Sequence, residues 1–284
     1  MIKVKLIHNQ PLDLASTFQS GQVFVWRQDG SWWNGVLGDH LIVLREQPGV
    51  LEFRTTLRPE SRLIPLLYRY FRLDDDLASI QASLSKDTRV AEAIHHYPGL
   101  RLLRQDPWPC LAAFICSSNT NILRIIKMID QLSLALGQVV SIGGVTRSVF
   151  PSATIVADAG EVALRELGLG YRARYLAETA KIITENSLKL ERLREMSFGD
   201  ARNCLLKMAG VGDKVADCVL LFSLEKPQSF PIDRWVRRVL EESYSIPREL
   251  PYQLLMAWAQ NQFGPYAGYA QQYLFHRRRV ETKL

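Results

Sequence analysis

Cysteine is scarce in this sequence, and the few cysteines lie far apart. The chain of 284 residues contains four, Cys110, Cys116, Cys204 and Cys218, and no two of them form a CxxC pair. Zinc ribbons, iron–sulfur clusters and disulfide scaffolds need closely or regularly spaced cysteines, so this spacing argues against all three. Long apolar runs are missing as well, both for a membrane span and for the core of a signal peptide. We therefore expect an intracellular protein without a membrane segment or signal peptide.

Histidine is also sparse, with five residues in the whole chain. The adjacent pair His95-His96 attracts attention as a metal site, but neighbouring residues on a helix point to different faces. No acidic partner stands at a spacing that would complete a ligand set. We therefore expect no metal at this pair and no catalytic metal in the protein.

The remaining composition is that of an ordinary globular protein, with 47% hydrophobic and 23% charged residues. The formal net charge is +6, which suits a polyanionic partner such as nucleic acid. The chain is long enough for roughly two domains with ample core.

The first 56 residues or so are rich in short apolar runs separated by turn signals. Strands are predicted at 2–6, 24–27, 32–37, 41–44 and 51–54, with turns at 28–30 and 38–39. From Arg58 the pattern becomes helical, with two apolar faces formed by Leu63, Leu66, Leu67 and Tyr70, and by Leu77, Ile80 and Leu84. The sequence thus predicts an α+β fold: a small N-terminal antiparallel β-sheet with helices over 1–98, followed by a mostly helical domain over 99–284.

Helical patterns continue through the second part of the chain. Helices are expected from Pro107, from Asn121, from Ser152, over 175–186, over 188–195 and from Ser197, and Gly137 to Gly144 is interpreted as a connector. Asn119, Thr120 and Asn121 can cap the helix that follows them, and Arg124 lies off its apolar face. At the far end, 276–279 is interpreted as a solvated or phosphate-facing basic segment.

A glycine hairpin stands at the centre of this helical part. Gly210-Val211-Gly212 separates two apolar-periodic stretches, which predicts a helix-hairpin-helix unit over about 205–222. The backbone N–H groups at the start of the second helix are left without partners, and such a helix end attracts phosphate. We expect these three residues to contact a DNA phosphate.

Lys214 opens the second helix, where a cation is disfavoured because the positive end of the helix dipole repels it. The same position, together with burial, favours the neutral amine, which forms Schiff bases with carbonyl carbons. Asp213 and Asp217 act in the opposite direction. A surface lysine paired with Asp217 therefore remains an alternative.

Asp233 follows Pro231 and Ile232 and precedes a new apolar-periodic stretch, so it is an expected helix N-cap. A carboxylate in this place can also stabilise positive charge that develops on a sugar. Each residue alone has an ordinary interpretation. Lys214 and Asp233 together, behind a glycine hairpin, favour catalysis.

This hairpin, lysine and Pro-x-Asp arrangement resembles the helix-hairpin-helix (HhH-GPD) DNA glycosylases, and within them the 8-oxoguanine DNA glycosylase branch. Supporting stretches occur in the expected order at 102–107, 114–119, 168–175 and 264–268. The resemblance extends from about Ser20 to the C-terminus. It implies a bifunctional DNA glycosylase and abasic-site lyase of base excision repair. Such an enzyme excises 8-oxoguanine paired with cytosine through a lysine Schiff base and β-elimination, with Lys214 and Asp233 as the catalytic residues.

The resemblance also assigns a base pocket and a set of residues for the opposite strand. The pocket residues are Gly21, Cys218, Gln271 and Phe275. Gly21 matches a glycine whose carbonyl reads the altered N7 of the lesion, and Gln271 matches a reader of the Watson–Crick edge. Asn119, Arg124 and Arg172 match residues that bind the cytosine left behind, and Tyr171 matches a wedge beside it.

One position departs from the pattern, because Trp235 stands where eukaryotic members have a phosphate-binding histidine. Arg234 or Arg238 is the expected replacement, and the lack of long insertions suggests a compact prokaryotic-type member. The implied partner is damaged double-stranded DNA, bound by a monomer in the cytoplasm and nucleoid of a prokaryote or the nucleus of a eukaryote. No cofactor is implied beyond a possible monovalent cation at the hairpin.

Two other functions remain open at this point. One is a glycosylase of the same superfamily for a different damaged base, and the other is a non-catalytic module that binds duplex DNA through the hairpin.

Overall fold

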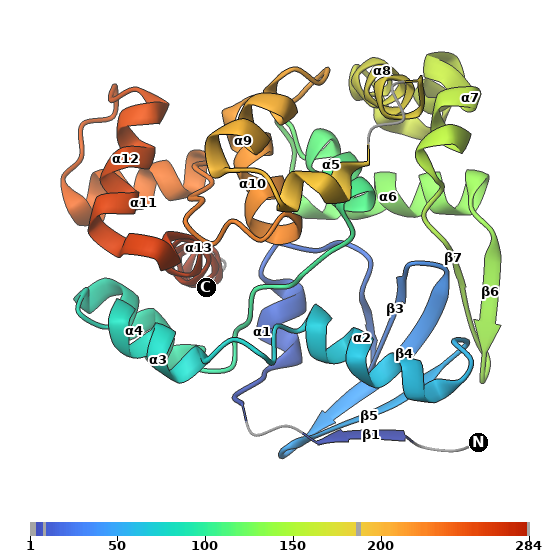
Figure 1. Ribbon diagram of the computed structural model, residues 1–284, viewed down its shortest axis with the longest axis horizontal. Coiled ribbons are helices and arrows are strands. Elements are labelled where there is room, and N and C mark those ends of the chain that lie inside the picture. Colours follow the sequence, from blue (N-terminus) through green and yellow to red (C-terminus); the bar gives the residue numbers. More distant parts are fainter. Residues whose placement is uncertain (1–3, 8–9, 186–188, 283–284) are drawn as a thin grey trace.

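The computed structural model describes residues 4–7, 10–185 and 189–282, and it places an antiparallel sheet beneath a larger helical part (Figure 1). The strands of the sheet are β1 (Val4–Ile7), β2 (Arg27–Asp29), β3 (Trp32–Leu37), β4 (His40–Gln47) and β5 (Val50–Thr55). They pair in the order β1-β5-β4-β3-β2, each antiparallel to its neighbour. The expected antiparallel sheet is confirmed, but only β2 to β5 form a meander, because β1 pairs with β5. A helix within this region, α1 (Leu14–Gln19), was not expected.

The second strand lies later in the chain than predicted, since pairing with β3 begins at Arg27 and includes Gln28 and Asp29. The apolar run before it is a buried loop instead. Trp26 stacks on Phe18 at 4.3 Å between ring centroids and donates its indole N–H to the hydroxyl of Tyr70 at 2.9 Å. Trp26 therefore packs against α1 and α2 (Leu63–Tyr70) instead of pairing in the sheet.

The helical elements between the sheet and the hairpin unit have the following bounds: η1 (Glu60–Arg62), α2 (Leu63–Tyr70), α3 (Leu77–Leu84), α4 (Thr88–His96), α5 (Pro107–Cys116), α6 (Ile122–Leu136), α7 (Ala153–Leu164), η2 (Arg165–Leu169), α8 (Arg172–Glu185) and η3 (Leu190–Arg194). The hairpin unit and the C-terminal part contain α9 (Phe198–Leu206), α10 (Asp213–Ser223), α11 (Arg234–Tyr244), α12 (Tyr252–Phe263), η4 (Gly264–Tyr266) and α13 (Ala267–Glu281).

The helix starts follow from side chains that accept backbone hydrogen bonds. Asn121 accepts from the N–H of Arg124 and begins α6, while Ser152 and Ser197 begin α7 and α9 in the same way. These starts are confirmed. Residues 186–188 of the expected helical stretches lie outside the described residues.

The connector expected over 137–144 is wrong. This region begins a second, two-stranded sheet formed by β6 (Val139–Ile142) and β7 (Val145–Ser148). Gly143 and Gly144 both have positive φ angles, of 56° and 83°, which is what a tight two-residue hairpin turn requires. The glycine pair was a turn signal between short strands rather than a sign of irregular chain.

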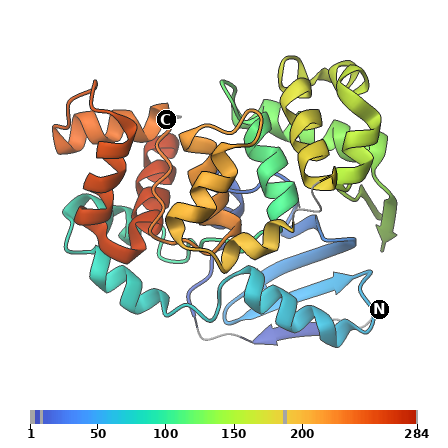
Figure 2. The same cartoon turned by 45° about the horizontal axis from the view of Figure 1, so that its top comes forward.

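Two hydrophobic clusters form the core. One joins the sheet with α1 and α2, and the larger one joins the helices around α5 and α10. Helices α3 and α4 contribute Leu77, Ile80, Leu84 and Val90 to the larger cluster, and both ribbon views show them beneath α11 and α13 (Figures 1 and 2). The domain boundary expected at residue 98 stays a prediction.

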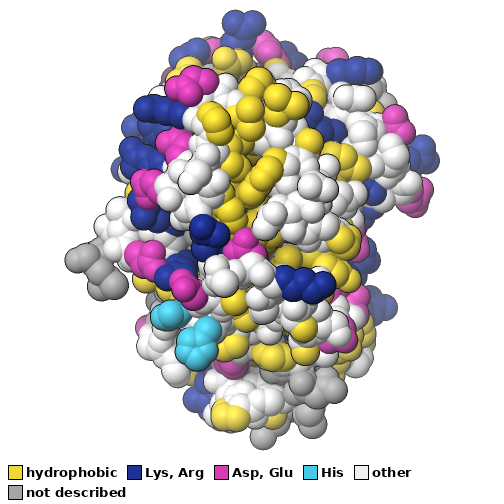
Figure 3. All heavy atoms as spheres, turned by 90° about the vertical axis from the view of Figure 1, so that its left-hand side faces the viewer, with side chains coloured by type: hydrophobic (Ala, Val, Ile, Leu, Met, Phe, Trp, Pro, Cys, Tyr) yellow, Lys and Arg dark blue, Asp and Glu magenta, His cyan; other side chains and the backbone are white. Residues whose placement is uncertain are grey.

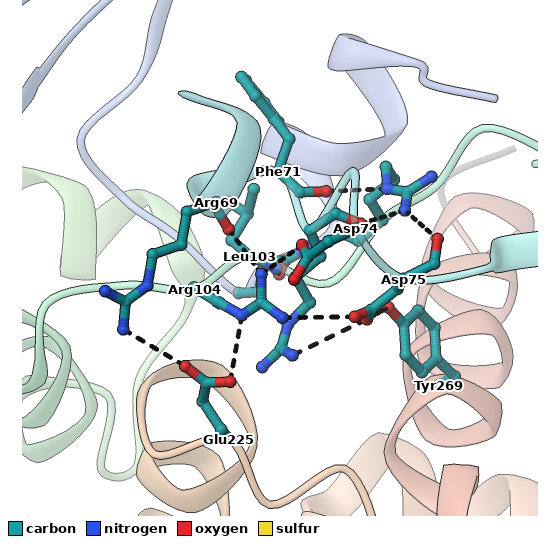
Figure 4. A network of polar contacts seen from close by, with 11 residues as sticks. Arg69, Phe71, Asp74, Asp75, Leu103, Arg104, Glu225 and Tyr269 are labelled. Carbon is teal, nitrogen blue, oxygen red and sulfur yellow. Dashed lines mark hydrogen bonds and ion pairs between the residues drawn. The ribbon is translucent and has the colours of Figure 1, made fainter. Parts of the chain in front are cut away.

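A polar network fixes the sheet part against the helical part (Figure 4). Arg104, in the segment before α5, pairs with Asp74 at 2.5 Å, with Asp75 at 3.4 Å and with Glu225 at 3.2 Å. Asp75 also accepts from the hydroxyl of Tyr269 on α13 at 2.6 Å. The turn after α2, the loop after α10 and helix α13 are thereby held together around one guanidinium.

The predictions about the histidine pair, a metal site and a membrane segment can be compared with the structure. Figure 3 looks onto the side formed by α3, α4, α11 and α12 and shows histidine side chains open to solvent; His95 and His96 of α4 are both exposed. Within residues 4–7, 10–185 and 189–282, no three His, Cys, Asp or Glu residues gather as a metal site. No helix in that described part is both long enough and apolar enough to cross a membrane.

Candidate active site

The helix-hairpin-helix unit consists of α9, the turn 207–212 and α10. Gly210 has φ of 72°, and a Cβ placed on it would lie 2.6 Å from the Cβ of Tyr175. Only glycine fits both the left-handed backbone and this close approach to α8. Gly212 is the N-cap of α10 and provides no side-chain hydrogen bond, so the first N–H groups of α10 have no side-chain cap.

Lys214 lies in the first turn of α10 and points toward α5. Its Nζ donates to the Oγ of Ser117 at 2.8 Å and lies 5.1 Å from the ring centroid of Phe114. The alternative ion pair with Asp217 is wrong, because Asp217 is completely buried and turned toward α9 and α12. The amine is therefore not held by a carboxylate of its own helix.

Asp217 instead forms part of a buried network beneath the hairpin. Arg202 donates to Asp217 at 3.0 Å and to Asp213 at 2.6 Å. The hydroxyl of Tyr252 donates to Asp217 at 2.6 Å and accepts from the backbone N–H of Ile232 at 3.2 Å. This chain of contacts joins the helix that carries Lys214 to the segment that carries Asp233.

Asp233 is the N-cap of α11, as expected, and accepts from the N–H groups of Trp235 at 2.9 Å and Val236 at 2.8 Å. Burial raises the pKa of its carboxyl above the usual range, although these hydrogen bonds and the nearby Lys214 favour the charged form. A carboxylate in such a place interacts strongly with positive charge because little water screens it.

Lys214 and Asp233 face the same small pocket, and all four expected base-pocket residues line it with them. Its lining is Gly21, Phe114, Lys214, Cys218, Phe222, Pro231, Asp233, Gln271, Gln272 and Phe275. These residues come from the loop after α1, from α5, α10 and α13, and from the segment just before α11, so only the tertiary structure could bring them together. The roles assigned to them stay predictions.

The pocket volume is about 40 Å³, enough for roughly three water molecules. A purine base occupies a larger volume than this. Phe275 is only half-buried and stands over Gly21, whose added Cβ would meet the Phe275 ring at 3.0 Å.

The remaining walls differ in polarity. Burial raises the pKa of the Cys218 thiol to about 12, so this residue is a neutral, apolar surface and not a nucleophile. Gln271 is 5% exposed, and within the described part of the chain its Oε1 has no hydrogen-bond partner. A buried acceptor without a partner is costly, so this atom is suited to meeting a donor from a ligand.

Three of the four residues expected to contact the opposite strand lie together, and Arg124 lies apart from them. The hydroxyl of Tyr171 donates to the carbonyl of Ser118 at 3.0 Å, and Arg172 donates to the same carbonyl and to that of Asn119 at 3.3 Å. Arg172 also lies 4.5 Å from the ring centroid of Tyr171. Arg124 is exposed on α6, as expected, but no side-chain contact joins it to the others among the described residues.

The segment 276–279 is not a solvated end. His276 is buried, Arg277 pairs with Glu92 at 2.5 Å, and Arg278 pairs with Glu242 at 2.6 Å. Arg279 donates to the carbonyl of Gln19 beside the pocket loop. These side chains belong to α13 and connect it to α1, α4 and α11, which the charge pattern alone could not reveal.

Several neighbours of Lys214 and of the pocket were missed as site residues. Ser117, Phe114 and Pro231 stood inside stretches that supported the resemblance, while Phe222 and Gln272 carried no signal beyond helical spacing. Trp235, which stands where the family pattern has a histidine, is half-buried. The guanidinium carbon of Arg238 lies 5.9 Å from its ring centroid.

A larger hollow of about 880 Å³ lies between the sheet and α5, α6 and β7. Leu66 lines it and is exposed, whereas Leu63, Leu67 and Tyr70 of the same expected helix face are buried. The hollow contains neither Lys214 nor Asp233. The candidate active site is therefore the smaller pocket, where an amine and a carboxylate meet.

Comparison with known proteins gives matches over most of the chain. Two family models match: 8-oxoguanine DNA glycosylase, N-terminal domain, over residues 4–111, and HhH-GPD superfamily base excision DNA repair protein over residues 112–261. The N-glycosylase/DNA lyase OGG1 of Arabidopsis thaliana is 35% identical over 293 residues, which covers 96% of this chain and 78% of that protein.

Solved structures give the same result. MBOgg1 in complex with a low affinity DNA ligand has a TM-score of 0.93 at 32% identity, covering 99% of this chain and 96% of that one. The Clostridium acetobutylicum 8-oxoguanine glycosylase/lyase, in complex with DNA that has cytosine opposite 8-oxoG, has a TM-score of 0.90 at 29% identity, covering 95% and 93%. The resemblance is confirmed, and this chain belongs to the 8-oxoguanine DNA glycosylases of the HhH-GPD superfamily.

Proposed function

We propose that this protein is a bifunctional DNA glycosylase and abasic-site lyase that removes 8-oxoguanine paired with cytosine. The observation that carries the proposal is the meeting of Lys214 and Asp233 at one pocket that also contains Gly21 and Gln271. The Clostridium acetobutylicum relative, named as an 8-oxoguanine glycosylase/lyase and solved both alone and bound to DNA with cytosine opposite 8-oxoG, supports the substrate. We also propose that the protein acts as a monomer on damaged duplex DNA, in the cytoplasm and nucleoid of a prokaryote or the nucleus of a eukaryote.

Recognition depends on flipping the nucleotide out of the duplex, because its C1′ atom is out of reach inside the stack. In the pocket, the Oε1 of Gln271 accepts from the N–H groups on the Watson–Crick edge of the base. The carbonyl of Gly21 accepts the N7–H that 8-oxoguanine has and guanine lacks. Normal guanine would leave that acceptor facing another acceptor, and such a mismatch in a buried site discriminates strongly.

The reaction uses the amine and the carboxylate directly. The lone pair of neutral Lys214 forms a bond to C1′ while the C1′–N9 bond breaks, and the departing base takes up the proton that the amine loses. Asp233 stabilises the positive charge on the sugar. Opening of the sugar ring gives a Schiff base at C1′. Loss of a C2′ proton then expels the 3′ phosphate and breaks the strand.

In this proposal, the hairpin binds the DNA backbone. Gly210 and Gly212 present backbone N–H groups to a phosphate at the start of α10, whereas the N–H of Val211 already donates to the carbonyl of Met208 at 3.2 Å. Hairpin carbonyls would hold a monovalent cation: Ala209 already accepts from Thr179 at 2.9 Å, and a carbonyl has a second lone pair for the ion. Such a cation would add positive charge beside the phosphate, and the chemistry needs no other cofactor.

Borohydride trapping tests the proposal. An 8-oxoguanine:cytosine duplex should give a covalent adduct with the wild-type protein and none with Lys214→Gln, because glutamine has no nucleophilic amine. Base release without an adduct in the wild type would mean that water, and not Lys214, displaces the base. Neither adduct nor release, while an undamaged duplex binds equally well, would favour a different lesion or a binding module.

A further inference from the structure

The amine of Lys214 is held by Ser117, a residue to which no function has yet been assigned. Ser117 is the C-cap of α5, and its Oγ accepts from the Nζ of Lys214 at 2.8 Å. We propose that Ser117 is a positioning residue that sets the direction from which Lys214 meets the sugar. This inference rests on the proposed function, since it concerns the same amine in the same reaction.

The hydroxyl of Ser117 is itself fixed in direction. Its Oγ donates to the carbonyl of Phe114 at 2.6 Å. A hydroxyl has one proton and two lone pairs, so Ser117 faces Lys214 only as an acceptor. Lys214 must therefore donate one N–H to Ser117, and in the neutral amine the nitrogen lone pair is then turned away from Ser117. The lone pair is thereby left for the electrophile.

The surroundings of the amine leave Ser117 as its polar anchor. Lys214 also faces the aromatic ring of Phe114, at 5.1 Å from the centroid. Phe114 stacks in turn on Phe222, with centroids 5.6 Å apart. Asp217, which could have drawn the amine back toward α10, is occupied by Arg202 and Tyr252. An aromatic wall does not fix direction as a hydrogen bond does, so Ser117 supplies the orientation.

A purely structural role for Ser117 is the competing explanation, and the chain offers a matched control for it. Ser85 is the C-cap of α3, and its Oγ donates to the carbonyl of Gln81 at 2.8 Å, in the same manner as Ser117. Ser85 is exposed and does not line the pocket. Ser85→Ala therefore measures what the loss of a capping hydroxyl does without any effect on the amine.

The experiment compares wild type, Ser117→Ala, Ser117→Thr and Ser85→Ala on an 8-oxoguanine:cytosine duplex under single-turnover conditions. Base release, strand cleavage, borohydride trapping and duplex Kd are measured for each. Ser117→Ala should trap roughly 10-fold more slowly with an unchanged Kd, because misplacing a reacting group costs rate and not binding. Ser117→Thr, which keeps the γ oxygen, should recover most of the rate, and Ser85→Ala should match wild type.

The ratio of strand cleavage to base release separates positioning from folding. Water can replace a displaced amine at C1′ but cannot form a Schiff base, so Ser117→Ala should lose more cleavage than release. This ratio does not depend on the fraction of folded enzyme, and it stays informative even where Ser117→Ala folds poorly.

Two results would overturn the inference in distinguishable ways. Equal trapping rates and equal ratios in wild type and Ser117→Ala would show that Ser117 is only a helix cap, with the proposed function intact. A wild type that releases base without any trapped adduct would overturn the proposed function itself, and with it the need to position the amine.

Discussion

Asp233 caps α11 and, in the proposed reaction, supplies a negative charge beside Lys214. Burial of that charge lowers the stability of the fold. Its carboxylate caps α11 through the N–H groups of Trp235 and Val236, and burial raises its pKa above the usual range. Because the folded-state pKa is above the unfolded value, the folded chain holds the proton more tightly than the unfolded chain. The ionised carboxylate therefore lowers stability as pH rises through this window, and the loss is complete above the folded pKa. At neutral pH the free energy of unfolding is therefore lower than it would be with an uncharged group at this position beside Lys214.

Asp233→Asn should stabilise the protein at neutral pH while abolishing base release. Asparagine caps a helix as well as aspartate and carries no charge to bury. We expect Tm to rise by roughly 2 °C, corresponding to about 1 kcal/mol. Thermal unfolding and single-turnover assays check both effects. The control is Asp76→Asn, at the exposed N-cap of α3, which should not raise Tm; a lower Tm for Asp233→Asn would contradict the argument.

Wild-type activity should fall as pH decreases through the raised pKa of Asp233, because the protonated carboxyl no longer stabilises positive charge. The acid limb of the pH–rate profile should therefore lie above the ordinary aspartate value of about 3.9. A profile that stays flat down to that value would argue against a catalytic carboxylate at this position.

Arg172 bears on selectivity for the opposite base. It is 4% exposed, and its guanidinium is held by the carbonyls of Ser118 and Asn119 next to Tyr171. Arg172→Ala should relax selectivity for cytosine by roughly 1–3 kcal/mol, the value of a good bidentate pair with a base. Rates opposite all four bases test this. Arg174→Ala removes an exposed arginine that pairs with Glu178 on the same helix and should leave the ratios unchanged; unchanged ratios for Arg172→Ala would remove the assignment.

At the scale of elements, α10 and the start of α11 must keep a fixed separation for Lys214 and Asp233 to act together. The hydroxyl of Tyr252 on α12 bridges them, since it accepts from the N–H of Ile232 and donates to buried Asp217. Neither partner is part of the pocket lining. The catalytic spacing is therefore set by a third helix that contributes no catalytic group.

Tyr252→Phe should destabilise the protein by about 1–3 kcal/mol, because it leaves a buried N–H and a buried carboxylate each short of a partner. It should also slow base release more than it weakens duplex binding, since the amine and the carboxylate lose their relative position. Denaturant unfolding and single-turnover kinetics measure the two effects. Normal kinetics in a destabilised Tyr252→Phe protein would show that the bridge is structural only.

At the scale of the whole molecule, the network around Arg104 joins the sheet part to the helices that carry the pocket (Figure 4). Burial alone would raise the pKa values of Asp74 and Glu225, but hydrogen bonding and the charge of Arg104 outweigh it and lower both. Carboxylates with lowered pKa values stabilise the fold above their unfolded pKa. That contribution disappears as pH falls through the lowered folded values.

Arg104→Met should lower the free energy of unfolding at pH 7 by about 2 kcal/mol, less than for a fully buried pair because Asp74 and Glu225 are partly exposed. The difference from wild type should narrow as pH falls below about 4, the usual carboxyl range. Unfolding free energies measured from pH 7 to pH 3 check this, and a difference independent of pH would contradict an electrostatic role for the network.

The sequence by itself determined most of the elements and identified the family. The apolar alternation predicted the sheet, the capping residues predicted where α6, α7, α9 and α11 begin, and the glycine hairpin with Lys214 and Asp233 predicted the family and its reaction type. These signals are local, because a cap, a turn or a periodic face is encoded within a few neighbouring residues. Where local signals failed, as at 24–27 and 137–144, packing or an overlooked glycine turn decided the outcome.

Only the tertiary structure decided which residues meet. Gly21 and Gln271 are far apart in the chain, and no periodicity places them in one pocket. The hydrogen bond from Lys214 to Ser117 and the diversion of Asp217 to Arg202 and Tyr252 follow from how α5, α9 and α12 pack around α10. A side chain's partner depends on the neighbours that packing brings, which are distant in sequence. The direction of the amine is therefore a property of the fold.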